Sequence, residues 1–171
     1  PGWSPHVIPV AILGATGMVG QHYLSLLQDH PWFSLSDDPE IVFVCNPVAD
    51  AYALAREGKT VIDNRSLHRA EPLVPVQPHH HNPPVSLIAN PNCTLQSFLL
   101  PLPPLHEHFG IAQLSVTTLQ ATSGAGRDFR LSDTCLSHIP DEEHKTQTEP
   151  LKILDADFPI SVQCTRVPVS H

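Results

Sequence analysis

One of the four cysteines, Cys93, stands at a position where a thiol can act as a nucleophile. It follows Asn90-Pro91-Asn92, and apolar residues recur after it at the spacing of a helix, at Leu95, Phe98, Leu99 and Leu102. This spacing predicts a helix that begins near Asn92, with Cys93 in its first turn. Free N–H groups and the helix dipole favour a thiolate there, the form that attacks an aldehyde or an acyl phosphate. An inert, buried cysteine is the alternative that spacing alone leaves open.

The second chemical candidate is the glycine-rich segment 14–20, which lies between an apolar run at residues 10–13 and a helical pattern. Glycines allow a sharp turn and a close approach of the backbone to a pyrophosphate, and the following helix offers unpaired N–H groups. The segment therefore predicts a dinucleotide site formed by Gly14, Thr16, Gly17, Met18 and Val19. A tight strand–helix turn without a ligand is the alternative.

The elements that must position these residues fall into two blocks, 1–90 and 91–171. In the first block, short apolar runs suit buried parallel strands, at residues 10–13, 41–44, 61–62 and 86–89. Helical patterns follow the first two runs, and the second of them ends at Gly58, a favourable residue after a helix. Alternating strands and helices predict an α/β fold, with a Rossmann-like parallel sheet that binds the nucleotide.

One element of such a fold is predicted to be missing. A dinucleotide-binding sheet has a second strand, followed by an acid that binds ribose about 20 residues after the glycines. Here the helix ends near Pro31, and residues 36–39 lead directly to Ile41. Asp37 and Asp38 lie at about the right distance. The pattern favours a solvated turn for them over a place at the end of a strand.

The second block contains strand-like residues 114–119, a glycine turn at 123–126, a short helix at 149–154 and a final extended segment at 161–169. Three prolines are expected to end or bend the helix that begins near Asn92: Pro101, Pro103 and Pro104. Residues 142–145 are interpreted as a solvated helix face. The histidine run at 79–81 is interpreted as a solvated loop, so no metal site is predicted.

Composition excludes other classes of function. The net charge of −8 with neutral His argues against nucleic acid as a partner. No window reaches the roughly 18 consecutive apolar residues of a membrane span. The four cysteines show no C-x-x-C spacing and the N-terminus no signal-peptide pattern, so we expect reduced thiols and a cytoplasmic protein.

Five segments, taken in order, resemble aspartate-semialdehyde dehydrogenases, especially the fungal and archaeal branch: GATGMVG (14–20), NPNCT (90–94), VTTLQATSGAG (116–126), EPLKIL (149–154) and RVPV (166–169). The resemblance implies reductive dephosphorylation of 4-phospho-L-aspartate to L-aspartate 4-semialdehyde, with NADP as cofactor, in amino-acid biosynthesis. It also implies that residues 91–171 form part of an α+β catalytic and dimerisation domain of a homodimer or homotetramer.

The same resemblance implies a role for individual residues. Cys93 is the nucleophile that forms a thioester, and Gln120 helps to position the substrate. Glu149 binds the substrate amino group, Lys152 and Arg69 bind phosphate, and Arg166 clamps the substrate carboxylate with two parallel hydrogen bonds. The nicotinamide lies near Ser123, Gly124, Ala125 and Gly126. Without the resemblance, ordinary surface ion pairs are the interpretation of Glu149, Lys152 and Arg69.

The chain departs from the family pattern in several places. The family's catalytic histidine, in Arg-Val-Pro-Val-x-x-Gly-His, would fall two positions beyond His171, so we expect the chain as given to lack the acid/base. The family has several dozen more residues between Phe33 and Ile41, and the stretches around 77–85, 127–140 and 155–160 look shortened. We therefore expect weak binding of NADP with poor discrimination from NAD.

Two other functions stay open at this point. One is a non-catalytic, truncated remnant that binds a nucleotide or a partner. The other is a paralogous acyl-CoA or acyl-phosphate reductase.

Overall fold

The computed structural model describes residues 7–71, 86–126, 129–131 and 134–170, and the chain divides into two compact units, Pro1–Asn90 and Pro91–His171. The histidine run at 79–81 and His171 lie outside the described residues. No helix in the described ranges has the length and apolar character needed to cross a membrane.

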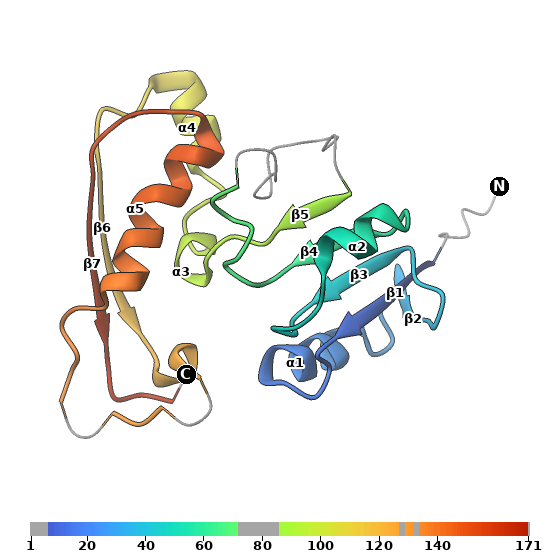
Figure 1. The fold of residues 1–171 in the computed structure, drawn as a ribbon. Coiled ribbons are helices and arrows are strands. Elements are labelled where there is room, and N and C mark those ends of the chain that lie inside the picture. Colours follow the sequence, from blue (N-terminus) through green and yellow to red (C-terminus); the bar gives the residue numbers. More distant parts are fainter. Residues whose placement is uncertain (1–6, 72–85, 127–128, 132–133, 171) are drawn as a thin grey trace. The chain divides into compact units, whose positions relative to one another are not determined.

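Five parallel strands form the sheet of the first unit, in the order β2-β1-β3-β4-β5 (Figure 1). They are β1 (Ile8–Leu13), β2 (Phe33–Leu35), β3 (Ile41–Val44), β4 (Thr60–Asp63) and β5 (Leu87–Ala89). Val10, Val44 and Val61 are fully buried. Strands covered on both faces are continuously apolar, which is why the sequence pattern found β1 and β3.

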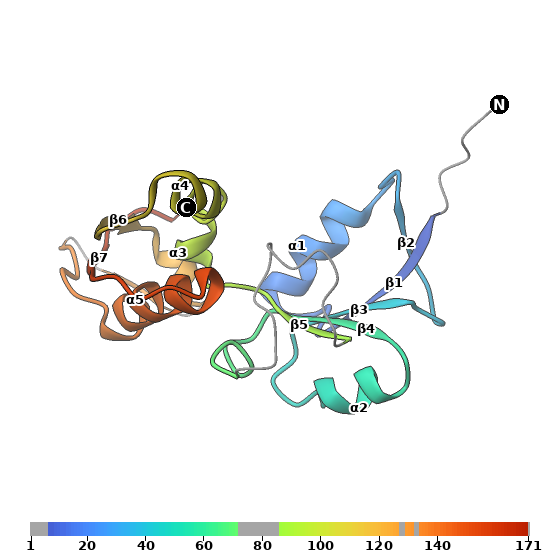
Figure 2. The same cartoon turned by 90° about the horizontal axis from the view of Figure 1, so that it is seen from above.

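Two helices cover this sheet on opposite faces, as Figure 2 shows: α1 (Met18–Leu27) on one face and α2 (Ala51–Arg56) on the other. Val10, Leu27 and Phe43 form the core under α1, where the ring of Tyr23 stacks on that of Phe43 at 4.6 Å between centroids. The strand order reverses direction between β1 and β3. Such a switch point opens a crevice at the carboxyl ends of the strands, where α/β proteins bind ligands. The predicted α/β fold is confirmed.

The prediction that the second strand is missing is wrong. Strand β2 spans three residues and pairs in parallel with β1, with Leu35 opposite Val10. The N–H of Ser36 donates to the carbonyl of Val10 at 3.0 Å and continues this ladder. Strand β2 is too short, and Ser34 at its centre too polar, to show a recognisable strand pattern in the sequence. Its stability comes from pairing with β1, which the local sequence does not reveal. Asp37 therefore follows a strand.

The second unit contains two parallel strands, β6 (Leu114–Gln120) and β7 (Ile160–Arg166), joined through the long helix α5 (Pro140–Leu154). Figure 1 shows α5 alongside both strands. The seven-residue register places Gln120 opposite Arg166 at the carboxyl ends of the two strands. The sequence predicted a helix at 149–154 and a separate helix face at 142–145, but not one continuous helix, because the first turns are polar and carry no apolar face. Acidic residues in that first turn instead favour the helix through its dipole.

The helix predicted after Asn92 is divided in two. Helix α3 (Cys93–Gln96) ends after one turn, and α4 (Leu102–Phe109) begins directly after Pro101. Pro103 and Pro104 lie in the first turn of α4, where a missing backbone N–H removes no helical hydrogen bond. These prolines begin a helix, although we expected them to end or bend one.

Candidate functional site

The glycine-rich loop between β1 and α1 is shaped by contacts that exclude side chains. Gly14 has φ +94°, and a Cβ atom there would lie 2.9 Å from the backbone nitrogen of Asn46. A Cβ atom at Gly20 would lie 2.2 Å from the carbonyl oxygen of Gly14. The first turn of α1 therefore packs directly on the loop, and only glycine fits at position 20.

The N-terminus of α1 suits an anionic ligand. Gly17 is the N-cap residue, and no described side chain caps the helix. The first N–H groups of a helix have no partner within it, so together with the dipole they attract phosphate. Thr16, Met18 and Val19 belong to the same loop and first turn. The backbone here has the form that a pyrophosphate site needs, and the binding of a dinucleotide by these residues stays a prediction.

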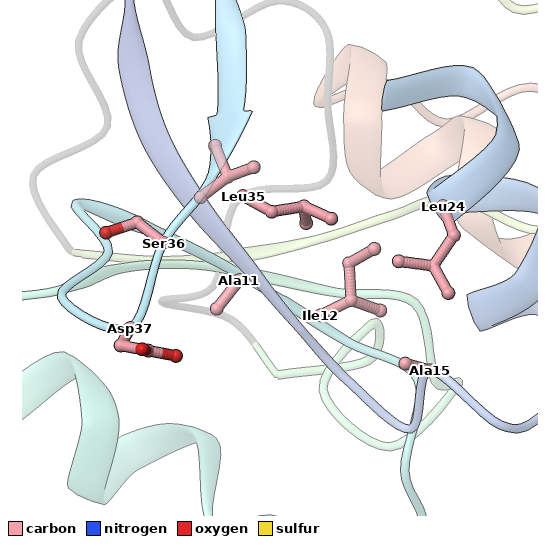
Figure 3. Close-up of a pocket in the computed structure, with 8 residues that line it drawn as sticks. Ala11, Ile12, Ala15, Leu24, Leu35, Ser36 and Asp37 are labelled. Atoms are coloured by element: carbon pink, nitrogen blue, oxygen red, sulfur yellow. The ribbon is translucent and has the colours of Figure 1, made fainter. Parts of the chain in front are cut away.

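A pocket of about 280 Å³ lies beside this loop, within the first unit (Figure 3). Its lining comes from β1, the loop, α1 and the end of β2: Val10, Ala11, Ile12, Ala15, Leu24, Leu35, Ser36 and Asp37. Most of this lining is apolar, which suits the flat face of an aromatic base. Asp37 brings a carboxylate to its edge.

A second pocket, also about 280 Å³, lies within the second unit and contains the thiol predicted to be the nucleophile. Its lining comes from α3, β6, the short helix η1 (Thr122–Ala125) and β7: Cys93, Thr94, Ser97, Thr118, Leu119, Gln120, Ala121, Ser123, Gly124 and Arg166. Cys93 is exposed. The structure thus brings together Cys93, Gln120 and Arg166, three residues that the resemblance assigned to one site.

Side chains of neighbouring elements fix the backbone on both sides of Cys93. The Asn92 side chain caps α3 by accepting a hydrogen bond from the N–H of Thr94 at 2.9 Å. The N–H of Asn92 donates to the Glu149 carboxylate at 2.7 Å. Asn92 Nδ2 donates to Glu142 Oε2 at 3.0 Å, and the Thr94 hydroxyl donates to the same oxygen at 3.3 Å. Two carboxylates of α5 therefore hold the turn that carries the thiol.

The interpretation of residues 142–145 as a solvated face is wrong for two of them. Glu142 binds Asn92 and Thr94, while Glu143 accepts a hydrogen bond from the N–H of Cys164 at 2.9 Å. Charge alone suggested a surface. The signal that could have found Glu142 is its spacing of seven residues from Glu149, because two helical turns place both carboxylates on one face.

The Glu142 carboxylate also determines how Gln120 is oriented. A carboxylate only accepts hydrogen bonds, so the hydroxyl hydrogen of Thr94 points to Glu142. The oxygen of Thr94 then accepts from Gln120 Nε2, at 2.9 Å, and Thr118 Oγ1 accepts from the same nitrogen at 3.2 Å. Both amide hydrogens of Gln120 are thereby used, and its carbonyl oxygen is the group available to the pocket.

Arg166 lies at the end of β7 and is only 4% exposed. Its Nη1 donates to the carbonyl of Ala121 at 2.7 Å and lies 2.9 Å from the point where a Cβ atom on Gly124 would be. A glycine at 124 is therefore what lets the guanidinium lie against η1. Ala125 ends η1, and Gly126 follows with φ +103°, which confirms the predicted glycine turn.

The remaining predicted residues occupy two different places. Lys152 lies on α5, one turn after the buried Glu149. Arg69 belongs to the first unit, where its Nε donates to the carbonyl of Asn90 at 2.7 Å and its Nη2 to that of Asn64 at 3.1 Å. Arg65 in the same segment forms a two-pronged ion pair with the fully buried Asp63, at 2.8 Å for each contact. The phosphate-binding roles of Lys152 and Arg69 remain predictions.

A parallel sheet with a switch point and a glycine loop is the architecture of dinucleotide-binding domains. Consistent with this, residues 9–37 match the family model described as semialdehyde dehydrogenase, NAD binding domain. The aspartate-semialdehyde dehydrogenase of Archaeoglobus fulgidus is 29% identical, covering 94% of this chain and 68% of its own. That of Schizosaccharomyces pombe is 27% identical over 94% of this chain and 67% of its own. The chain is thus similar, over nearly all of its length, to aspartate-semialdehyde dehydrogenases.

Structural comparison agrees with this family. The crystal structure of aspartate-semialdehyde dehydrogenase with NADP from Candida albicans superposes with a TM-score of 0.77 at 26% identity, covering 96% of this chain and 69% of that one. With the NAD-binding family model, it supports a nicotinamide dinucleotide as cofactor. The alignment with the archaeal relative runs over 233 residues, more than the 171 of this chain. The relative therefore carries internal segments that this chain lacks, as the sequence predicted.

Proposed function

We propose that the chain acts as an aspartate-semialdehyde dehydrogenase, which converts 4-phospho-L-aspartate to L-aspartate 4-semialdehyde and phosphate in cytoplasmic amino-acid biosynthesis. The observation that carries the proposal is that the exposed Cys93 thiol shares one pocket with Gln120 and Arg166. A nucleophile beside a guanidinium suits an acyl phosphate that also bears a carboxylate. The family resemblance implies NADPH as reductant and a homodimer or homotetramer as the assembly.

The proposed chemistry passes through a covalent bond to Cys93. The thiolate attacks the acyl carbon, the bond from that carbon to the phosphate oxygen breaks, and phosphate leaves with the electron pair. A bound nicotinamide dinucleotide supplies the hydride that reduces the resulting thioester. Hydride addition leaves the thiohemiacetal on Cys93 as its alkoxide. The alkoxide re-forms the C=O bond as the C–S bond breaks, so the aldehyde leaves and the electron pair returns to sulfur as the thiolate. Nucleophile and leaving group are thus the same sulfur.

The surrounding residues support these steps in different ways. Glu142 and Glu149 hold the backbone at Asn92 and Thr94, so the thiol is kept in place before substrate arrives. Gln120 offers a carbonyl oxygen to a donor on the substrate. In the proposal Arg166 binds the carboxylate, Glu149 the amino group, and Lys152 with Arg69 the phosphate. Ser123 to Gly126 lie near the nicotinamide.

The test is acylation of the intact chain by 4-phospho-aspartate, followed by mass spectrometry of its peptides. We expect an aspartyl thioester on Cys93, removed by hydroxylamine and absent from Cys93→Ser. Cys135 is the internal control, because it is also exposed but does not line the pocket. Equal modification of Cys93 and Cys135, or an adduct that persists in Cys93→Ser, would contradict the proposal.

A further inference from the structure

The carboxylate of Asp37 lies at the edge of the pocket beside the glycine loop, and we infer that it makes the first unit select NAD over NADP. The inference rests on the proposed binding of a dinucleotide, and it departs from the NADP that the family resemblance implies. It concerns the ribose subsite, for which the sequence places Asp37 and Asp38 at about the right distance while favouring a solvated turn.

The position of Asp37 follows from the strand that the sequence pattern missed. Parallel pairing of β1 with β2 brings their carboxyl ends to the same edge of the sheet, so the turn after Leu35 lies next to the loop after Leu13. Figure 3 shows Ser36 and Asp37 on one side of the pocket, and Ala15 with Leu24 on the other. A dinucleotide whose pyrophosphate lies at the N-terminus of α1 directs its adenosine ribose to the end of β2.

The charge at this edge of the pocket is negative. Asp37 is the only lining residue with an ionisable side chain, and no Lys or Arg belongs to the described lining. The neighbouring acid is engaged elsewhere: Lys59 Nζ donates to Asp38 Oδ1 at 2.9 Å, and Asp38 does not line the pocket. The positive charge of Lys59 is therefore paired with Asp38.

The two cofactors differ at the one group that this carboxylate would meet. The ribose of NAD carries a 2′-hydroxyl, which can donate a hydrogen bond to a carboxylate. The 2′-phosphate of NADP has only acceptor oxygens and carries close to two negative charges at neutral pH. Opposite Asp37, the 2′-phosphate gains no hydrogen bond and is repelled by the carboxylate. No Lys or Arg in the described lining offsets this repulsion.

The test is direct titration of the full chain with NADH and with NADPH, followed by the fluorescence of the reduced nicotinamide. Hydrogen bonds to charged groups contribute enough for about a tenfold change in affinity or more. We expect the chain to bind NADH at least about tenfold more tightly than NADPH. Because repulsion between exposed charges is screened, this ratio should shrink in high salt.

Two variants make the assignment specific. Asp37→Ser keeps a hydrogen-bonding group and removes the charge, so NADPH binding should improve and the preference should fall about tenfold. Asp38→Asn is the matched control, and it should leave the preference unchanged while thermal unfolding confirms that both variants are folded. Equal or tighter binding of NADPH by the unaltered chain, or an unchanged ratio in Asp37→Ser, would overturn the inference. Failure to bind either dinucleotide would instead overturn the proposed cofactor site.

Discussion

In the first unit the candidate ligand site is formed by backbone, whereas in the second unit it is formed by side chains. The loop at residues 14–20 depends on the absence of Cβ atoms at Gly14 and Gly20. The turn at Cys93 depends instead on hydrogen bonds that the carboxylates of Glu142 and Glu149 accept from Asn92 and Thr94. A backbone-built site therefore fails when an atom is added, and a site built from side chains fails when one is removed.

The largest effect should follow from adding one methyl group to the loop. In Gly20→Ala the new Cβ atom would overlap the carbonyl of Gly14, so either the loop or α1 must move. Overpacking of this kind costs typically about 1–3 kcal/mol, and we expect dinucleotide binding to be lost with it. Urea unfolding and NADH titration measure the two effects.

Gly58→Ala is the control for this substitution. Gly58 has φ +83° with open space around its Cβ position, so alanine there meets backbone strain alone. It should cost about 1–2 kcal/mol and leave NADH binding intact. If Gly20→Ala binds NADH as tightly as Gly58→Ala does, close packing at Gly20 does not determine the conformation of the loop.

The second unit should respond to removal of an acceptor. Glu142→Ala deprives Asn92 and Thr94, both buried, of their shared partner. Leaving buried donors unpaired costs about 1–3 kcal/mol, and the freed Thr94 hydroxyl no longer fixes the amide of Gln120. We expect lower stability and a changed pH profile for alkylation of Cys93.

The matched control is Glu107→Ala on α4, because Glu107 is exposed. It should alter neither the stability nor the alkylation profile. A Glu142→Ala chain that loses stability but keeps the original alkylation profile would show that Glu142 supports the fold without positioning the thiol.

A smaller effect is expected from pH. Burial raises the pKa of the Cys45 thiol, and burial also raises the pKa of Tyr23. A raised pKa in the folded state means that folding favours the protonated thiol. The contribution of the protonated thiol to the free energy of unfolding is fully present below the unfolded thiol pKa of about 8.5. This contribution is lost as pH rises through the folded pKa. Thermal unfolding from pH 7 to 10 should show the decline, weakened in Cys45→Ala and unchanged in Cys135→Ser.

The smallest effect should come from a side chain within the backbone-built loop. Thr16 is exposed, so Thr16→Ala should change stability by less than about 0.5 kcal/mol. NADH affinity should stay within a few-fold, because the phosphates are held by N–H groups. A large loss of affinity would show that the first unit also relies on side chains and would remove the contrast between the units.

The sequence was sufficient to predict an element where a local pattern of residues determines its structure. Strand β1 is at least half-buried along its length and reads as an apolar run. Gly14 and Gly20, which follow it, are required because a Cβ atom at either position would meet nearby backbone. Strand β2 and the continuity of α5 were missed, because their stability depends on partners distant in the chain. Glu142 was missed for the same reason, since its charge suggests solvent and its hydrogen bonds to Asn92 and Thr94 join residues far apart in the chain.

The parallel ladder of β6 and β7 also limits how this chain can change during evolution. The ladder places Gln120 opposite Arg166 through seven consecutive pairs. One inserted or deleted residue within either strand would turn one of these side chains to the opposite face. A change in length between the strands leaves the register intact. Relatives that carry additional internal segments can therefore differ greatly in length and still inherit the same juxtaposition, provided that each insertion lies in a connection.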